Sequence, residues 1–297
     1  MPSMVSILLR EEIRLLKPIL NMYGISTARS LQDKLGDMEA KSVASKVDFQ
    51  FFDIGGLKAC FAAPKQGGDA KGRVLLYLHG GAYVAGNIQY ASGFAGVLAA
   101  HTNRRVLSVA YGLAPENPFP AAVEDALAAY EYLLGNGYTA CDISLVGESA
   151  GGGLVYCLCL RLKQKGMPLP CALVGISPWT DLTFSGESYQ TNKKKDPVLY
   201  EDALRSYAEE YAQGQERNPL VSPLFGDLSE FPPSLLFAGG DELLLDDARM
   251  LAGRLTGSGC SCELVIEDGL WHAFVLYKIP EAKKALKTIA EFLERIK

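Results

Sequence analysis

Residues 147–151 read Gly-Glu-Ser-Ala-Gly and join an apolar run, residues 142–146, to a helix-like stretch, residues 152–162. A strand, a G-x-S-x-G turn and a helix in this order form a nucleophile elbow. The serine of such a turn takes strained backbone angles, and glycines two positions away on either side let the strand and helix pass without clashing. The helix directs its free N–H groups toward a developing oxyanion. This segment predicts Ser149 as a nucleophile.

The elbow lies within a chain whose apolar runs alternate with helical patterns, which indicates an α/β fold with a mostly parallel central sheet flanked by helices. Continuous apolar runs are typical of strands that are buried on both faces. The expected strands are residues 73–79, 105–111, 142–146, 172–176, 234–238 and 262–266, after a hairpin of residues 47–54 and 57–62. The expected helices are residues 92–101, 120–136, 153–165, 247–256 and 279–296.

Two regions fall outside this alternation. Residues 1–46 read as two helices and form an N-terminal helical cap segment, which leaves residues 47–297 as the catalytic domain. Residues 181–220 interrupt the pattern between two strands and include a helix at 200–212. An insertion there would lie above the carboxyl ends of the strands, where α/β proteins bind ligands. We therefore interpret residues 181–220 as a cap or lid.

A serine nucleophile needs a base, and in this arrangement the histidine follows the serine and the acid along the chain. The chain has three histidines, and His79 and His101 both precede Ser149. His272 lies in a loop after the last expected strand. His272 is therefore the predicted general base.

The acid is expected to follow the fifth of these strands, where Asp241 directly succeeds an apolar run and two glycines. Its carboxylate would accept the His272 Nδ1–H and stabilise the imidazolium. Three neighbours are rivals. Asp246 or Asp247 is better explained as the cap of the next helix. Glu242 is expected to point away if Asp241 points toward the histidine.

The oxyanion is expected to bind to backbone N–H groups of the glycine-rich loop that follows the strand at 73–79. Gly80, Gly81 and Ala82 are the predicted donors from this loop, and Ala150 is the predicted donor beside the nucleophile. His79 is interpreted as a side chain that organises the loop.

Composition excludes several other function classes. The net charge is −5, with 29 basic and 34 acidic residues, so no bias toward nucleic acid or anionic membrane is expected. The seven cysteines form no C-x-x-C pair and are interpreted as buried small hydrophobic residues, with no metal site. No signal peptide or membrane-spanning segment is evident, which favours a cytoplasmic protein.

At these motifs the chain resembles the hormone-sensitive-lipase-like bacterial carboxylesterases of the α/β-hydrolase family. Three further segments carry the resemblance: residues 111–125, 177–182 and 218–224. Two positions depart from the family pattern, because Gly112 replaces its usual arginine and Ala82 replaces its third loop glycine. The first 45 residues match only in being helical.

The resemblance implies the α/β-hydrolase fold with a helical cap, and a serine carboxylesterase that hydrolyses short- to medium-chain acyl esters without cofactor or metal. It also allows a homodimer. Tyr83 and Trp271 are candidate substrate-binding residues, with packing of the loop or core as the alternative for each. Lactone hydrolysis or deacetylation on the same triad, and a non-catalytic ligand receptor on the same fold, are the alternative functions.

Overall fold

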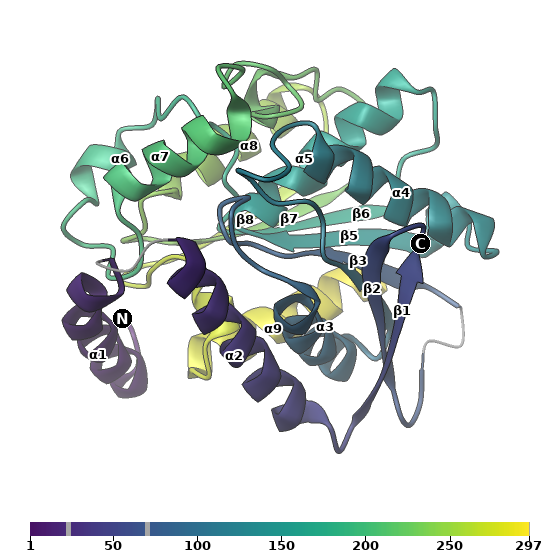
Figure 1. The fold of residues 1–297 in the computed structure, drawn as a ribbon, viewed down its shortest axis with the longest axis horizontal. Helices are drawn as coiled ribbons and strands as arrows, with labels where there is room; N and C mark the ends of the chain where they lie inside the picture. Colours follow the sequence, from purple (N-terminus) through teal and green to yellow (C-terminus); the bar gives the residue numbers. More distant parts are fainter. Residues whose placement is uncertain (22–24, 69–71, 297) are drawn as a thin grey trace.

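The structure, a computed structural model, describes residues 1–21, 25–68 and 72–296. Its centre is one twisted sheet, drawn edge-on across Figure 1. The strands all coincide with runs that the sequence predicts. They are β1 (Val47–Ile54), β2 (Leu57–Pro64), β3 (Val74–Leu78), β4 (Arg105–Val109), β5 (Ile143–Glu148), β6 (Ala172–Ile176), β7 (Ser234–Gly239) and β8 (Cys262–Glu267).

The strand order is β1-β2-β4-β3-β5-β6-β7-β8, so the predicted mostly parallel sheet is confirmed. The β1–β2 and β2–β4 pairs are antiparallel, and all the pairs from β4 to β8 are parallel. The chain leaves β3 toward β4 on one side and later places β5 on the other side of β3. This reversal is the topological switch point, and the loops after β3 and β5 therefore border the crevice where α/β sheets bind ligands.

Helices cover both faces of the sheet (Figure 1). On one face lie α4 (Ala121–Gly135), α5 (Ala150–Gln164) and α8 (Leu245–Gly257), and on the other lie α3 (Ile88–Thr102) and α9 (Pro280–Arg295). Each face holds its own buried hydrophobic cluster. None of the helices in the described part of the chain is long and apolar enough to span a membrane.

Helix α5 begins earlier than the sequence predicts. It starts at Ala150, directly after Ser149, and not at residue 153. The three glycines that follow Ala150 have poor helix propensity, which hides this start. Tertiary packing overrides that propensity, because a Cβ on Gly151 would lie 2.1 Å from the carbonyl oxygen of Leu78.

The cysteines differ in burial: Cys60, Cys157 and Cys159 are buried, Cys171, Cys260 and Cys262 are partly buried, and Cys141 is exposed. Cys157 and Cys159 on α5 are fully buried, as expected for small hydrophobic residues. Cys260 and Cys262, beside and on the edge strand β8, are partly buried and pack against the hydrophobic cluster, so the interpretation holds for them in part, and it is wrong for the exposed Cys141.

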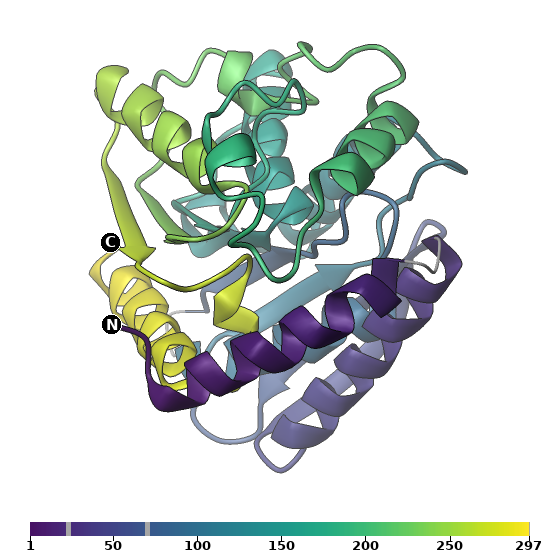
Figure 2. The same ribbon diagram turned by 90° about the vertical axis from the view of Figure 1, so that its left-hand side faces the viewer.

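The N-terminal helices α1 (Met4–Asn21) and α2 (Ile25–Val43) confirm the two helices predicted for the first 46 residues. In Figure 2, α1 runs across the front of the molecule beside α2, and the green segment from the insertion lies above α1. Helix α2 crosses α3 closely, since a Cβ on Gly36 would meet the Tyr90 backbone at 2.4 Å. The insertion carries α6 (Ser188–Thr191) and α7 (Glu201–Ala212), and the second of these was predicted.

Candidate active site

Ser149 sits at the turn between β5 and α5 with a strained backbone. Its φ of 54° and ψ of −123° lie in a region that non-glycine residues rarely adopt. The turn is held by bonds from Ser149 N to Ile176 O (2.9 Å) and from Trp179 N to Ser149 O (2.9 Å). A side chain on Gly147 would collide with the carbonyl of Gly151, at 2.2 Å. The local geometry is that of the elbow expected from the sequence.

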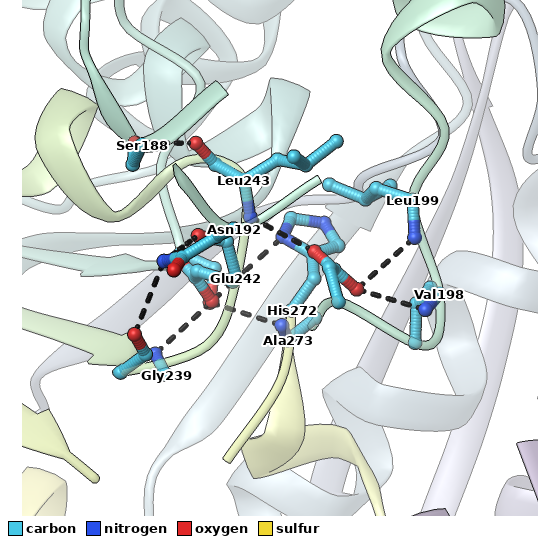
Figure 3. Close-up of polar contacts among 12 residues, drawn as sticks. Ser188, Asn192, Val198, Leu199, Gly239, Glu242, Leu243, His272 and Ala273 are labelled. Atoms are coloured by element: carbon cyan, nitrogen blue, oxygen red, sulfur yellow. Dashed lines mark hydrogen bonds and ion pairs between the residues drawn. The ribbon is translucent and has the colours of Figure 1, made fainter. Parts of the chain in front are cut away.

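His272 lies in the loop after β8, and only 5% of it is exposed. Burial lowers the pKa of His272 to about 3, so the imidazole is neutral and able to accept a proton. Its Nδ1 lies 4.0 Å from Oε2 of Glu242 (Figure 3). The separation is longer than a hydrogen bond.

The structure places the two adjacent carboxylates differently from the expectation that Asp241 faces the histidine. The Asp241 carboxylate turns outward to an ion pair with Arg10, at 2.7 Å between Arg10 Nη1 and Asp241 Oδ2. Consecutive side chains diverge here because the chain folds back after β7, with Glu242 N donating to Gly239 O at 3.2 Å. The same turn directs Glu242 into the interior, where it is fully buried. The structure thus brings Glu242, not Asp241, to His272.

Asp246 and Asp247 also differ from expectation. Both lie in the first turn of α8, whose N-cap is Leu244, so neither caps the helix. Asp246 instead accepts from Ser188 N (2.8 Å), and Asp247 accepts from Thr180 N (2.8 Å). These carboxylates hold the insertion to α8.

Ser177 connects the Glu242 carboxylate to the backbone directly after His272. Its hydroxyl donates to Glu242 Oε2 at 2.6 Å and accepts from Ala273 N at 2.9 Å. Burial raises the pKa of Glu242, and the hydrogen bonds from Ser177 and from Gly239 N oppose this rise. Sequence reasoning missed this role of Ser177, whose signals are its place directly after β6 and at the start of the segment 177–182.

The loop after β3 has the shape expected of an oxyanion loop. Gly81, Ala82 and Tyr83 all have positive φ, at 111°, 53° and 62°. Among the residues that the structure describes, none accepts a hydrogen bond from the backbone N–H of Gly81 or Ala82. The N–H of Ala150 belongs to the first turn of α5, where helix N–H groups have no partner within the helix.

Gly80 is the exception among the predicted donors, because its N–H is already used. It donates to the buried carboxylate of Glu148 at 2.5 Å. Glu148, the second residue of the elbow motif, also accepts from the hydroxyls of Tyr77 (2.6 Å) and Tyr90 (3.1 Å). Burial raises the pKa of Glu148 to about 7, although all three bonds lower it. Glu148 therefore ties the oxyanion loop to the elbow, a role that sequence reasoning missed.

Replacing this carboxylate should destabilise the protein. We expect Glu148→Ala to lower the free energy of unfolding by about 1–3 kcal/mol for each buried donor left without a partner. Denaturant titration of the variant against wild type would measure the loss. Glu148→Gln keeps one acceptor oxygen and should lose less, and equal stability of Glu148→Ala and wild type would contradict the role given to this side chain.

His79 organises the oxyanion loop, as expected. Its ring stacks on Tyr111 at 4.2 Å, and its Nδ1 donates to Gly80 O at 2.7 Å. Burial lowers the pKa of His79 to about 4, so the ring is neutral.

The two candidate substrate-binding aromatics are both fully buried. Tyr83 stacks on Tyr211 of α7, with ring centroids 3.8 Å apart. Trp271 meets Tyr277 edge-on, at 5.4 Å, within the hydrophobic cluster on the α3 and α9 side of the sheet. These contacts favour the packing alternative for both rings, and most strongly for Trp271.

Comparison with known proteins identifies the family of this chain. A family model described as alpha/beta hydrolase fold matches residues 75–276. The chain is 40% identical over 225 residues to an acetyl-hydrolase of Streptomyces hygroscopicus, covering 75% of each protein. It superimposes with a TM-score of 0.89 and 34% identity on a crystal structure of an esterase from the bacterial hormone-sensitive lipase family, over 100% of this chain and 99% of that one.

A third relative is the esterase EstE5, whose crystal was soaked with p-nitrophenyl butyrate. The match has a TM-score of 0.86 and 33% identity, over 95% of this chain and 97% of that one. The chain therefore belongs to the α/β-hydrolase family, in its hormone-sensitive-lipase branch, and is a carboxylic ester hydrolase.

Proposed function

We propose that the protein hydrolyses esters with short- to medium-chain acyl groups through a covalent intermediate on Ser149. The observation that carries this proposal is the strained serine at the switch point of the sheet, followed along the chain by the buried pair of Glu242 and His272. The Ser149 Oγ attacks the ester carbonyl carbon while Nε2 of His272 takes its proton. The alcohol leaves with that proton, and an acyl-enzyme remains.

The second half of the reaction reverses these roles. Water gives a proton to His272 and attacks the acyl carbon, and the acid and free Ser149 are released. Glu242 replaces Asp241 as the acid of the triad, orienting the imidazole and stabilising its charged form. Active-site hydrogen bonds are often long without substrate, so a movement of about 1 Å would bring Nδ1 and the carboxylate into bonding distance.

The oxyanion is proposed to rest on the N–H groups of Gly81, Ala82 and Ala150. Gly80 is left out of the proposed donors, because its N–H is bonded to Glu148. Two or three preorganised donors at the developing negative charge are the usual source of the largest electrostatic contribution to acyl transfer.

The acyl-chain preference follows from the aromatic side chains beside the elbow. Tyr83, Tyr211 and Trp179 are fully buried, and the ring centroids of Tyr83 and Trp179 lie 6.3 Å apart. The relative from Streptomyces hygroscopicus is named an acetyl-hydrolase, and EstE5 was soaked with a butyrate ester. The acetyl-hydrolase name and the butyrate soak both favour small acyl groups. The acetyl-hydrolase name also makes deacetylation of a small molecule the second candidate function.

We propose that α1, α2 and the insertion at 181–220 together form the cap. Arg29 of α2 donates to Val84 O (2.7 Å) and Ala114 O (3.0 Å), next to the oxyanion loop. From the other side, α7 contributes Tyr211 to the stack on Tyr83. The homodimer and the cytoplasmic location stay predictions.

The experiment is hydrolysis of p-nitrophenyl esters from acetyl to decanoyl. We expect kcat/KM to be highest for the acetyl to butyryl esters and to fall for longer chains, because the buried aromatics limit the space beside Ser149. A lactone and an acetylated sugar assayed in parallel would separate the alternatives. If a folded protein turned over none of the esters, the proposal would be wrong, and ligand binding on the same fold would be tested next.

A further inference from the structure

The loop that carries Glu242 is held in place by hydrogen bonds from the insertion at residues 181–220, and not only by the strands and helices around the central sheet. Residues 239–243 form a tight turn after β7, and the backbone on both sides of Glu242 is bonded to the insertion between β6 and β7 (Figure 3). The inner contact comes from Asn192, which is 3% exposed. Its side-chain Nδ2 donates to Gly240 O at 3.1 Å and to Glu242 O at 3.0 Å.

Asp196 and Ser188 hold the residue after Glu242. The Asp196 Oδ2 accepts from Leu243 N at 2.9 Å, while the Ser188 hydroxyl donates to Leu243 O at 2.6 Å. Oδ1 of Asp196 accepts from Val198 N (2.8 Å) and Leu199 N (3.1 Å), which fixes the carboxylate within its own loop. The same carboxylate therefore joins the insertion to residues 239–243, which we call the acid loop.

Helix α1 contacts both the insertion and the acid loop. Lys17 Nζ donates to the carbonyl oxygens of Asp196 and Leu199, both at 2.6 Å. Arg10 donates to Lys195 O at 3.0 Å and pairs with Asp241. The outward-facing Asp241 is thus a contact for α1, and α1 meets the insertion and the acid loop at the same place.

We propose that Asn192 and Asp196 are positioning residues that set the distance between Glu242 and His272, with Lys17 of α1 supporting Asp196. This inference rests on the proposed triad of Ser149, His272 and Glu242. The rate depends steeply on position, because a displacement of about 1 Å between catalytic groups can lower it about 100-fold. Glu242 lies in a short turn, and Asn192 and Asp196 hold the backbone on either side of it.

The test compares Asn192→Ala and Asp196→Asn with wild type on p-nitrophenyl acetate. We expect kcat to fall by roughly 10- to 100-fold with KM changed by less than about threefold, because the acyl site is untouched. Titration of the active serine with a fluorophosphonate would correct kcat for any unfolded fraction. Asp196→Asn keeps the shape of the side chain and guards against misfolding of the alanine variant.

Asp181→Asn is the matched control. Asp181 is a buried aspartate of the same insertion that accepts from Thr183 N (2.8 Å) and Ser185 N (2.9 Å) and, within the described part of the chain, makes no hydrogen bond to residues 239–243. It should lower stability, as Asp196→Asn does, and leave kcat per titrated serine close to wild type. An equal loss of kcat in both variants would overturn the proposal.

Combination with Glu242→Gln separates positioning from general destabilisation. If Asn192 acts through Glu242, adding Asn192→Ala to Glu242→Gln should lower kcat by less than about threefold further, which is strongly non-additive. Full additivity would refute the inference. If Glu242→Gln itself retained wild-type activity, the proposed triad would fail instead, so the two failures are distinguishable.

Discussion

Ser149→Ala should lower kcat/KM for p-nitrophenyl acetate by on the order of 10⁴- to 10⁶-fold while leaving the fold intact. The reason is that Ser149 Oγ is the only proposed nucleophile, and its removal leaves only the oxyanion donors and substrate binding to act. The fully buried surroundings of the elbow lose a single hydroxyl, so no large cavity forms. Steady-state kinetics of the purified variant, with circular dichroism as a check on folding, would measure the effect.

A second substitution guards this result against an unfolding artefact. Ser149→Gly should be as inactive as Ser149→Ala but should unfold at no lower temperature than wild type, because glycine accepts a φ of 54° without strain. Activity of either variant within tenfold of wild type would contradict the proposed mechanism.

Glu242→Gln should lower kcat by on the order of 10³- to 10⁴-fold, whereas Asp241→Asn should lower it by less than about tenfold. Glutamine removes the negative charge that stabilises the imidazolium of His272 and presents an amide that cannot hold the correct tautomer. Asp241→Asn removes only a 20% exposed carboxylate that pairs with Arg10, and such pairs contribute little. Parallel measurement of kcat for both variants would decide between two adjacent carboxylates.

The pair of variants is its own control, since both replace a carboxylate by its amide one residue apart on the same loop. The reverse ranking, with Asp241→Asn inactive and Glu242→Gln active, would restore the assignment expected from the sequence. Recovery of activity in Glu242→Asp would not be expected, because the shorter side chain would lie farther from a histidine that is already 4.0 Å away.

Much of the fold could be predicted from the sequence because its signals are local. Each strand is a short apolar run between turn residues, and the six runs coincide with β3 to β8 to within two residues at each end. The elbow could be recognised for the same reason, since strand, turn and helix are contiguous in the chain. His272 was predicted as the general base by elimination among three histidines.

Most of the remaining differences from expectation concern groups whose role depends on direction. Asp241 and Glu242 are neighbours in sequence with the same chemistry, and only the turn from Gly239 to Glu242 decides which one faces inward. Gly80 was expected to donate to the oxyanion because its loop was recognised, but its N–H direction depends on Glu148, a residue 68 positions away. The early start of α5 was hidden because glycines have poor intrinsic helix propensity.

The sequence by itself therefore determined the α/β architecture, the turn that carries Ser149 and the loop that carries His272, because these depend on periodicity and on contiguous motifs. The tertiary structure alone decided which carboxylate faces His272, which N–H groups stay available, how Asn192 and Asp196 reach residues 239–243, and how Lys17 reaches the loop of Asp196. Asp196 lies 47 positions from Leu243 and 179 positions from Lys17 in the sequence. Hydrogen bonds between residues so far apart leave no periodic pattern in the sequence.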